Sequence, residues 1–417
     1  MKHIVLIVLT VLGSGRFRAQ AQDPPSIIII MADQLRFDVL GELTPNIESL
    51  RRDGVEFSRT YCASPICVPS RASFFTGLSP NTHGSLINGW EDEDAVYSKV
   101  KAGVPNLYNL LEQKWDSYHV GKQHLFTSDV VDGPQSRTKW VTQKDYSEWT
   151  RKKGVEKPGG KQFKGMVPEM ISGERTHTRE YSMPVVARYD HGIVNFLDHY
   201  IASQCVKAIK ERDKSKPLLL NAMFLAPHPP FHIPEPYYSM MDGSDIHVPD
   251  NVGQWYKGQS PLQLYNITGF VGTRYDREQW TEVWKKYLGL VKLLDDEVGR
   301  LIESLKAEGL YDESIVIFTS DHGEMLGSHS LWQKMCMYEE SARVPLIIKF
   351  PASFKTATKS VGDPVSLVDV FPTLLDYAGV KIPAGLDGQS LVPFVNGDKA
   401  AARRPVFVQY DGNGSLG

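Results

Sequence analysis

The chain has 417 residues, of which 41% are hydrophobic and 23% are charged. This composition is typical of a globular protein with a large core and excludes a disordered chain. The formal net charge of -3, from 46 basic and 49 acidic residues, gives no global field that would attract nucleic acid or a membrane surface.

The N-terminus has the pattern of a targeting segment. An apolar run at residues 4–12 is followed by the small-x-small motif Ala19-Gln20-Ala21. The run is too short to cross a bilayer as a helix, so we interpret residues 1–21 as a secretory signal peptide. The alternative is a buried strand, because Arg16 and Arg18 interrupt the expected neutral stretch. We therefore expect an exported protein, periplasmic or secreted, without a membrane span.

Apolar runs alternate with helical patterns, which predicts an α/β fold: a large, mostly parallel mixed sheet flanked by helices. Four runs are interpreted as buried strands, at residues 27–31, 117–120, 218–224 and 315–319. Polar residues follow each run at once, and ligands of parallel sheets bind at the carboxyl ends of the strands. The polar residues expected to converge at this edge are Asp33, Gln34, Lys122, His124, His228, Asp321 and His322.

Helices are predicted at residues 45–52, ended by Gly54, at 195–212 and at 278–310. The polar segment 130–190 reads as a loop-rich insertion, either shaping a substrate pocket or running passively over the surface. Residues 365–395 favour a helix, a turn and a strand. We thus expect a catalytic domain at 22–395 and, at 396–417, the start of a small C-terminal subdomain that is truncated just after the apolar run 405–410.

The segment Cys67-Val68-Pro69-Ser70-Arg71 carries the chemical argument. Pro69 suits the first turn of a helix that Gly77 can end. Cys67 then lies at a helix N-terminus, where free N–H groups and the dipole favour an anion and lower the pKa of a thiol. Arg71, one turn along, can offer a planar set of donors to an oxyanion. The alternative is a buried structural cysteine beside a helix cap.

The other cysteines are Cys62, Cys205 and Cys336. If Cys67 is a reactive group, an odd number remains, so complete disulfide pairing is not expected. No Cys-x-x-Cys pair indicates a zinc site.

The motif at residues 67–71 resembles the C-x-P-S-R signature of the formylglycine-dependent type I sulfatases, members of the alkaline-phosphatase-like superfamily. The match continues through Ala72-Ser73 and from Thr76-Gly77 to Gly84, and the resemblance covers residues 27–395. The remaining matching positions, in family order, are Asp33, Gly121-Lys122, His124, Pro227-His228, Ser320-Asp321-His322-Gly323 and Lys334. The resemblance implies that a separate formylglycine-generating enzyme oxidises Cys67 to formylglycine, whose hydrated form supplies a hydroxyl nucleophile.

The resemblance also implies a divalent metal, which the anionic substrate and nucleophile require. The expected ligands are Asp33, Gln34, Cys67 in its converted form, Asp321 and His322. Because Ca²⁺ prefers oxygen, His322 is either a marginal ligand or a contact for the substrate. Ca²⁺ is our first choice and Mg²⁺ the alternative, because carboxylates are hard oxygen ligands. Many sulfatases have Asp in place of Gln34 and Asn in place of His322, so these two positions depart from the common pattern.

The expected catalytic residues are Cys67, Arg71, Lys122, His124, His228 and Lys334. The two lysines would bind sulfate oxygens as point charges, His124 would orient or deprotonate the diol, and His228 would protonate the leaving oxygen. His83 is expected to support the loop after the Cys67 helix, and His232 is a weaker candidate. The residues considered for contact with the leaving group are Trp90, Arg274, Tyr275, His329 and Trp332.

The predicted function is removal of sulfate from a sulfated carbohydrate outside the cytoplasm. The first alternative is a phosphonate monoester or phosphodiester hydrolase of the same superfamily, which Gln34 and His322 favour. The second is an inactive carbohydrate-binding relative.

Overall fold

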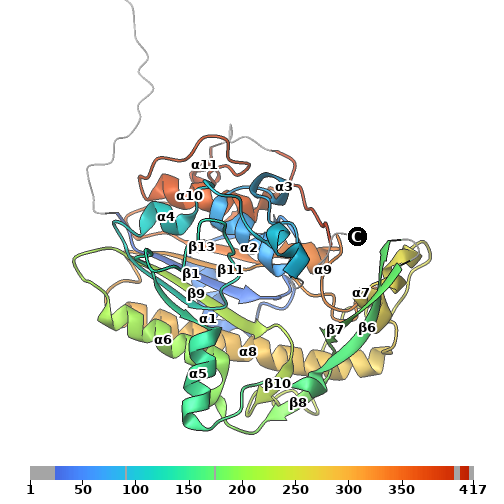
Figure 1. The fold of residues 1–417 in the computed structure, drawn as a ribbon. Coiled ribbons are helices and arrows are strands. Elements are labelled where there is room, and N and C mark those ends of the chain that lie inside the picture. Colours follow the sequence, from blue (N-terminus) through green and yellow to red (C-terminus); the bar gives the residue numbers. More distant parts are fainter. Residues whose placement is uncertain (1–23, 90–91, 173–174, 399–403, 413–417) are drawn as a thin grey trace, which may run out of the picture.

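The structure is a computed structural model that describes residues 24–89, 92–172, 175–398 and 404–412. Its centre is an eight-stranded sheet in the order β14-β2-β13-β11-β1-β9-β4-β5 (Figure 1). The strands of this sheet are β1 (Ile27–Asp33), β2 (Val55–Phe57), β4 (Asp116–Gly121), β5 (Lys139–Thr142), β9 (Leu218–Pro227), β11 (Ile315–Ser320), β13 (Leu346–Lys349) and β14 (Ser360–Val361).

The sheet is mostly parallel, as predicted. Strand β1 pairs in parallel with β11 on one side and β9 on the other, and β9 continues in parallel to β4. Only β13 reverses direction, pairing antiparallel with β11 and β2. All four strands predicted from apolar runs are present, so the polar residues that follow them lie at one edge of the sheet.

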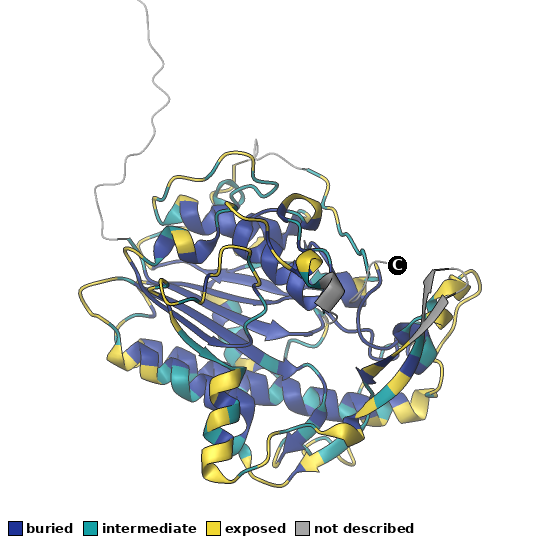
Figure 2. Ribbon diagram, viewed as in Figure 1, coloured by how far each residue is buried: buried dark blue, intermediate teal, exposed yellow. Residues whose placement is uncertain are grey.

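Both faces of the sheet are covered, and this explains the unbroken apolar sequence of β1 (Figure 2). Alternate side chains enter opposite cores: Ile28 and Ile30 belong to one cluster, and Ile27 and Ile29 to the other. Helices α1 (Pro45–Asp53), α6 (Leu197–Glu211) and α8 (Arg277–Ala307) cover the first face. Helices α2 (Cys67–Thr76), α4 (Leu107–Leu111) and α10 (Val370–Tyr377) cover the second.

The prediction of a loop-rich insertion at 130–190 was wrong. The segment contains α5 (Gln143–Lys153), β8 (Val186–Tyr189) and a hairpin of β6 (Lys164–Ser172) and β7 (Arg175–Ser182) that projects beside the sheet edge. Helix α5 begins with a capping box between Thr142 and Asp145, a sequence signal that we overlooked. The hairpin is hard to predict from sequence because burial in it does not follow residue polarity: Met166 is exposed and Arg179 is buried.

The tail also differs from expectation, because the segment predicted as a strand ends in helix α11 (Val392–Val395). Residues 404–412 include no helix or strand, although Gln409 N–H donates to the carbonyl oxygen of Ala63 at 2.9 Å. The remaining elements are β3 (Thr60–Tyr61), β10 (Phe231–Pro234), β12 (Arg343–Val344), β15 (Val365–Ser366), α3 (Pro80–His83), α7 (Ile267–Gly272), α9 (Glu339–Ala342) and the 3-10 turns Asp92–Ser98, Lys161–Phe163, Ile193–Asn195, Pro261–Tyr265 and Leu367–Asp369.

Within the described ranges, no helix is long and apolar enough to span a membrane. The predicted signal peptide, residues 1–21, lies outside the described residues.

Candidate active site

Cys67 is the first residue of α2, as predicted, and the whole helix is buried. Gly77 ends the helix with a φ of 69°, the left-handed conformation that glycine adopts without strain. The Ser70 hydroxyl donates to the Asp321 carbonyl oxygen at 2.5 Å, and Val68 N–H donates to Asn88 Oδ1 at 3.1 Å. These bonds fix the first turn of α2 against the end of β11 and so fix the position of Cys67.

Asp33, Cys67, Asp321 and His322 form a buried cluster whose ligand atoms all lie within 4.8 Å of one another. The Oδ1 atom of Asp33 has no hydrogen-bond partner among the described residues. His322 Nδ1 donates to the Gly323 carbonyl oxygen at 3.0 Å, so Nε2 is the ring nitrogen that points into the cluster. Two buried carboxylates, one of them with an unsatisfied oxygen, fit a divalent cation.

Arg71 lies behind this cluster and contacts both carboxylates. Its Nε donates to Asp321 Oδ2 at 2.9 Å and its Nη2 to Asp33 Oδ2 at 3.2 Å. Nη1 donates to the carbonyl oxygen of Lys122 at 3.2 Å. The sequence suggested that this guanidinium would face an oxyanion; in the structure its donors hold the carboxylates in place.

Two lysines border Cys67. Lys122 Nζ contacts Asp33 Oδ2 and lies 3.5 Å from Cys67 Sγ. Burial alone would raise the pKa of the Cys67 thiol, but Lys122, Lys334 and His322 together hold it well below its usual value. Burial would likewise raise the pKa of Asp33, and Lys122 lowers it instead. The surroundings of Cys67 therefore favour negative charge at this position.

Gln34 and Glu324 form a contact that we did not predict. The Gln34 side-chain amide donates to Glu324, while Lys334 Nζ donates to Gln34 Oε1 at 2.5 Å. Glu324 is fully buried, and burial raises the pKa of its carboxyl group. In the sequence Glu324 stands out only as an acidic residue next to the apolar pair Met325 and Leu326. That pattern alone does not predict that Glu324 lies near Gln34. Glu324 thus orients the amide oxygen towards Lys334.

His124 and His228 complete the site. Burial and the charge of Lys122 lower the pKa of His124 to about 4, so His124 is neutral near pH 7 and able to accept a proton. His228 Nε2 lies 3.3 Å from Lys334 Nζ, and its Nδ1 contacts the Pro229 carbonyl oxygen. Burial and then Lys334 lower the pKa of His228.

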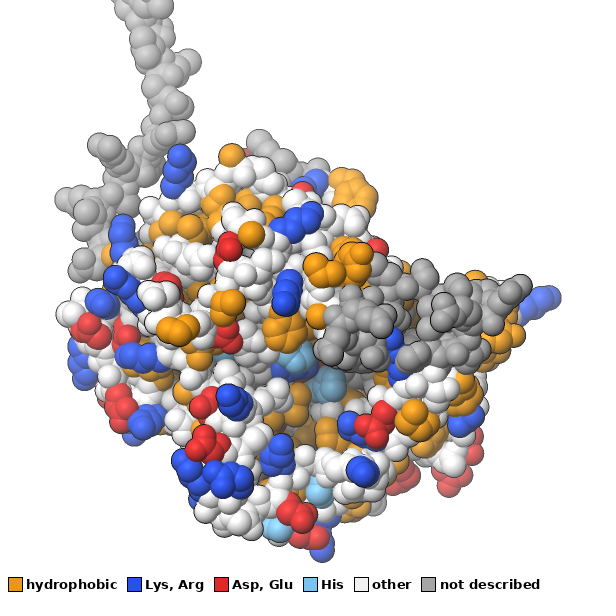
Figure 3. Space-filling model, in the orientation of Figure 1, with side chains coloured by type: hydrophobic (Ala, Val, Ile, Leu, Met, Phe, Trp, Pro, Cys, Tyr) orange, Lys and Arg blue, Asp and Glu red, His pale blue; other side chains and the backbone are white. Residues whose placement is uncertain are grey.

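These side chains open into a cavity of about 550 Å³. Its floor contains Cys67, Lys122, His124, His228 and Lys334, and its wall includes residues 178–182 of β7. Figure 3 shows the molecule hollowed on this face, with histidine side chains inside the hollow. Part of the hairpin insertion therefore does shape the cavity, as one of our two alternatives for that segment proposed.

Four of the residues proposed to contact the leaving group, Arg274, Tyr275, His329 and Trp332, do not line this cavity. Trp90 lies outside the described residues. Arg274 stacks on Phe270, and His329 stacks on Tyr338 with ring centroids 4.2 Å apart. Tyr275 packs on Trp280, and Trp332 is fully buried in the core. Aromatic residues in predicted loops therefore did not identify the contacts with the leaving group, because their rings pack against neighbouring residues.

His83 and His232 bond to other parts of the chain and do not face the Cys67 cavity. His83 Nε2 lies 2.9 Å from Ser73 Oγ, which confirms its predicted support of the loop after α2. His232 Nδ1 accepts from Gly159 N–H at 3.0 Å. All four cysteines are buried and free, whereas the odd count left by Cys67 predicted only that pairing would be incomplete.

Comparisons with known proteins agree with this geometry. The sequence profile of the family described as Sulfatase matches residues 25–380. An arylsulfatase of Clostridium perfringens is 30% identical over 390 residues, which cover 88% of this chain and 77% of that one. An N-acetylglucosamine-6-O-sulfatase of Bacteroides thetaiotaomicron is 24% identical over 438 residues, covering 90% of this chain and 71% of that one.

A solved structure extends the comparison to another activity. The phosphonate monoester hydrolase of Agrobacterium radiobacter superposes with a TM-score of 0.75 at 25% identity, covering 93% of this chain and 80% of that one. The fold of this chain is therefore also similar to that of a phosphonate monoester hydrolase.

Proposed function

This chain belongs to the formylglycine-dependent sulfatase family of the alkaline-phosphatase-like superfamily, and it is a sulfatase. From that premise, we propose that it removes sulfate from a sulfated carbohydrate, using a formylglycine made from Cys67 and a divalent cation. The observation that carries the proposal is the position of Cys67, which starts α2 and belongs both to the cluster with Asp33, Asp321 and His322 and to the floor of the cavity. The sugar-specific relative from Bacteroides thetaiotaomicron supports the carbohydrate.

The cation would be held by Asp33, Asp321 and His322, with Gln34 Oε1 and the converted Cys67 as further ligands. Ca²⁺ is our choice and Mg²⁺ the alternative, since the set is dominated by oxygen. When bound, the cation would supply positive charge that offsets the repulsion between an anionic ester and its nucleophile. Arg71, which already contacts both carboxylates, would position these ligands.

The other residues have separate tasks in this mechanism. Lys122 and Lys334 would bind the sulfate oxygens and stabilise the charge that develops on them. His124, neutral near pH 7, would accept a proton from the hydrated aldehyde. His228 would give a proton to the leaving oxygen, and the anionic substrate would raise its pKa by offsetting the charge of the nearby lysines.

We propose further that the protein is exported to the periplasm or outside the cell. The support is the pattern of residues 1–21, and the test is N-terminal sequencing of the exported protein. In this proposal residues 22–395 form the catalytic domain. A formylglycine-generating enzyme would be the maturation partner.

A phosphonate monoester or phosphodiester hydrolase is the second candidate function. Gln34 and His322 favour it, as does the fold of the Agrobacterium radiobacter enzyme. The deciding experiment compares kcat/KM for 4-nitrophenyl sulfate with kcat/KM for bis(4-nitrophenyl) phosphate, using Cys67→Ala as the control. We expect the sulfate to be preferred; a strong preference for the diester would overturn the proposal.

A further inference from the structure

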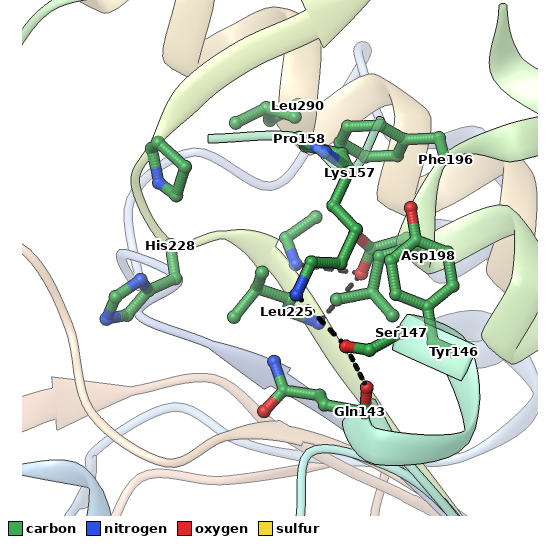
Figure 4. Close-up of a pocket in the computed structure, with 13 residues that line it drawn as sticks. Gln143, Tyr146, Ser147, Lys157, Pro158, Phe196, Asp198, Leu225, His228 and Leu290 are labelled. Carbon is green, nitrogen blue, oxygen red and sulfur yellow. Dashed lines mark hydrogen bonds between the residues drawn. The ribbon is translucent and has the colours of Figure 1, made fainter. Parts of the chain in front are cut away.

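A second cavity, of about 310 Å³, lies beside the one that contains Cys67 (Figure 4). It is enclosed by α5, the first turn of α6, the end of β9 and one residue of α8, Leu290. A volume of this size is at the lower end of the range for ligand pockets, about 300–1,000 Å³. The space therefore suits one ring of a ligand and excludes a long oligosaccharide.

The chemistry of the cavity combines apolar walls with a buried acid. Tyr146, Phe196 and Leu290 supply apolar surface. Asp198 is 1% exposed, and its Oδ1 accepts hydrogen bonds from the N–H groups of Leu225 at 2.7 Å and Ala226 at 2.9 Å. None of the described residues donates a hydrogen bond to Asp198 Oδ2. Because Asp198 lines the cavity, Oδ2 can accept a hydrogen bond from a ligand or water there.

The mouth of the cavity favours a neutral ligand over a cationic one. Lys157 Nζ donates to Ser147 Oγ at 3.1 Å, which in turn donates to the Gln143 carbonyl oxygen at 2.8 Å. The ammonium group at the mouth would repel a cation. Hydroxyl groups, by contrast, can donate to Asp198 and accept from Lys157, and a ring bearing them can pack on Tyr146 and Phe196.

His228 connects this cavity to the catalytic one, because it lines both. Figure 4 shows His228 at one edge of the cavity and Asp198, Lys157 and Tyr146 on the other side. In the proposed mechanism His228 protonates the leaving oxygen, so that oxygen lies next to His228. The body of the leaving alcohol must then extend from this point.

We propose that the cavity at Asp198 binds a hydroxylated ring of the leaving alcohol, a single sugar residue, with Asp198 Oδ2 accepting from one of its hydroxyl groups. This inference rests on the proposed function, and it identifies Asp198 as a specificity-determining residue. Burial also raises the pKa of Asp198 to about 7, so the carboxyl group can accept or donate near neutral pH.

The test compares kcat/KM for 4-nitrophenyl sulfate with kcat/KM for glucose 6-sulfate, galactose 6-sulfate and N-acetylglucosamine 6-sulfate. In Asp198→Asn we expect the ratio of the best sugar sulfate to the aryl sulfate to fall about tenfold or more, since a hydrogen bond to a charged group is lost. The matched control is Glu211→Gln, the same chemical change on an exposed residue at the far end of α6, which leaves the ratio unchanged.

A second variant, Ser147→Trp, fills the cavity from α5 and leaves Asp198 unchanged. It serves as the test if the Asp198→Asn variant fails to fold. It is expected to lower the same ratio. An unchanged ratio in the folded variants overturns the assignment of the cavity alone. A wild type that cleaves the aryl sulfate and none of the sugars overturns both that assignment and the carbohydrate substrate of the proposed function. A wild type that cleaves no sulfate ester overturns the proposed function, and the inference with it.

Discussion

The Nε2 atom of His322 lies 3.2 Å from the Sγ atom of Cys67. The other ring nitrogen donates to the Gly323 carbonyl oxygen, so Nε2 is the atom that points at the nucleophile position and at Asp33 and Asp321. A histidine at a position where many relatives have asparagine can therefore serve the same cluster, with nitrogen in place of an amide oxygen.

The variant His322→Ala is expected to bind Ca²⁺ at least about tenfold to a hundredfold more weakly, because the site loses a ligand. The measurement is recovery of aryl sulfate turnover as Ca²⁺ is titrated into chelator-treated enzyme. The control is His329→Ala, since His329 stacks on Tyr338 away from the cluster. Equal Ca²⁺ dependence of His322→Ala and the wild type would remove His322 from the metal site.

Lys122→Met is expected to lower kcat/KM for aryl sulfate by about 10²–10³, the effect of removing one donor from developing negative charge. Lys122 contacts Asp33 and lies beside Cys67. Lys139→Met is the matched control, because the Lys139 side chain is 53% exposed. A Lys122→Met enzyme that retains wild-type kcat/KM would show that the ammonium does not act on the substrate.

Arg71→Lys is expected to destabilise the protein by about 3–5 kcal/mol, because the planar set of donors that contacts two buried carboxylates is lost. The free energy of unfolding would be measured by urea denaturation in the presence of chelator. Arg51→Lys, at a partly exposed pair with Glu48, is the control. A loss below about 1 kcal/mol for Arg71→Lys would mean that one ammonium group replaces the guanidinium.

The raised pKa of Asp198 predicts that the free energy of unfolding depends on pH. Its folded-state pKa of about 7 lies above the unfolded value, so folding favours the protonated form. Wild-type stability should therefore fall as the pH rises from about 4 to about 7, by at most about 4 kcal/mol, since one pKa unit corresponds to about 1.4 kcal/mol.

The variant Asp198→Asn lacks this loss of stability. Its melting temperature relative to the wild type should rise over that interval and level off above it, as scanning fluorimetry would show. Glu211→Gln, whose carboxylate is exposed, provides the baseline. A difference between Asp198→Asn and the wild type that stays constant with pH contradicts the assignment.

The sequence predicted the strands well because an apolar run such as 27–31 has one physical explanation, a strand buried on both faces. It also placed Cys67 at the start of a helix, since Pro69 and Gly77 limit where that helix begins and ends. Convergence of the polar residues at one edge then followed from the parallel topology.

Contacts between residues that are far apart in the chain could not be predicted from the sequence. Arg71 contacts Asp321 across 250 positions, and Gln34 contacts Glu324 across 290. Neither pairing produces a local pattern, so Arg71 was assigned to an oxyanion and Glu324 was overlooked. Cavities cannot be predicted from the sequence for the same reason. In the sequence Asp198 is an ordinary acidic residue in the first turn of a helix, and only the packing of β9 against α6 shows that it lines a cavity.

The central claim, that Cys67 becomes formylglycine, is tested most directly by the mass of the tryptic peptide at residues 60–71 after alkylation of thiols. This peptide also contains Cys62, which serves as an internal control. Conversion replaces the sulfur of Cys67 by oxygen and removes two hydrogens, so the peptide from active enzyme should be lighter and carry one alkyl group, on Cys62. A peptide from active enzyme that carries alkyl groups on both Cys62 and Cys67 would contradict the account.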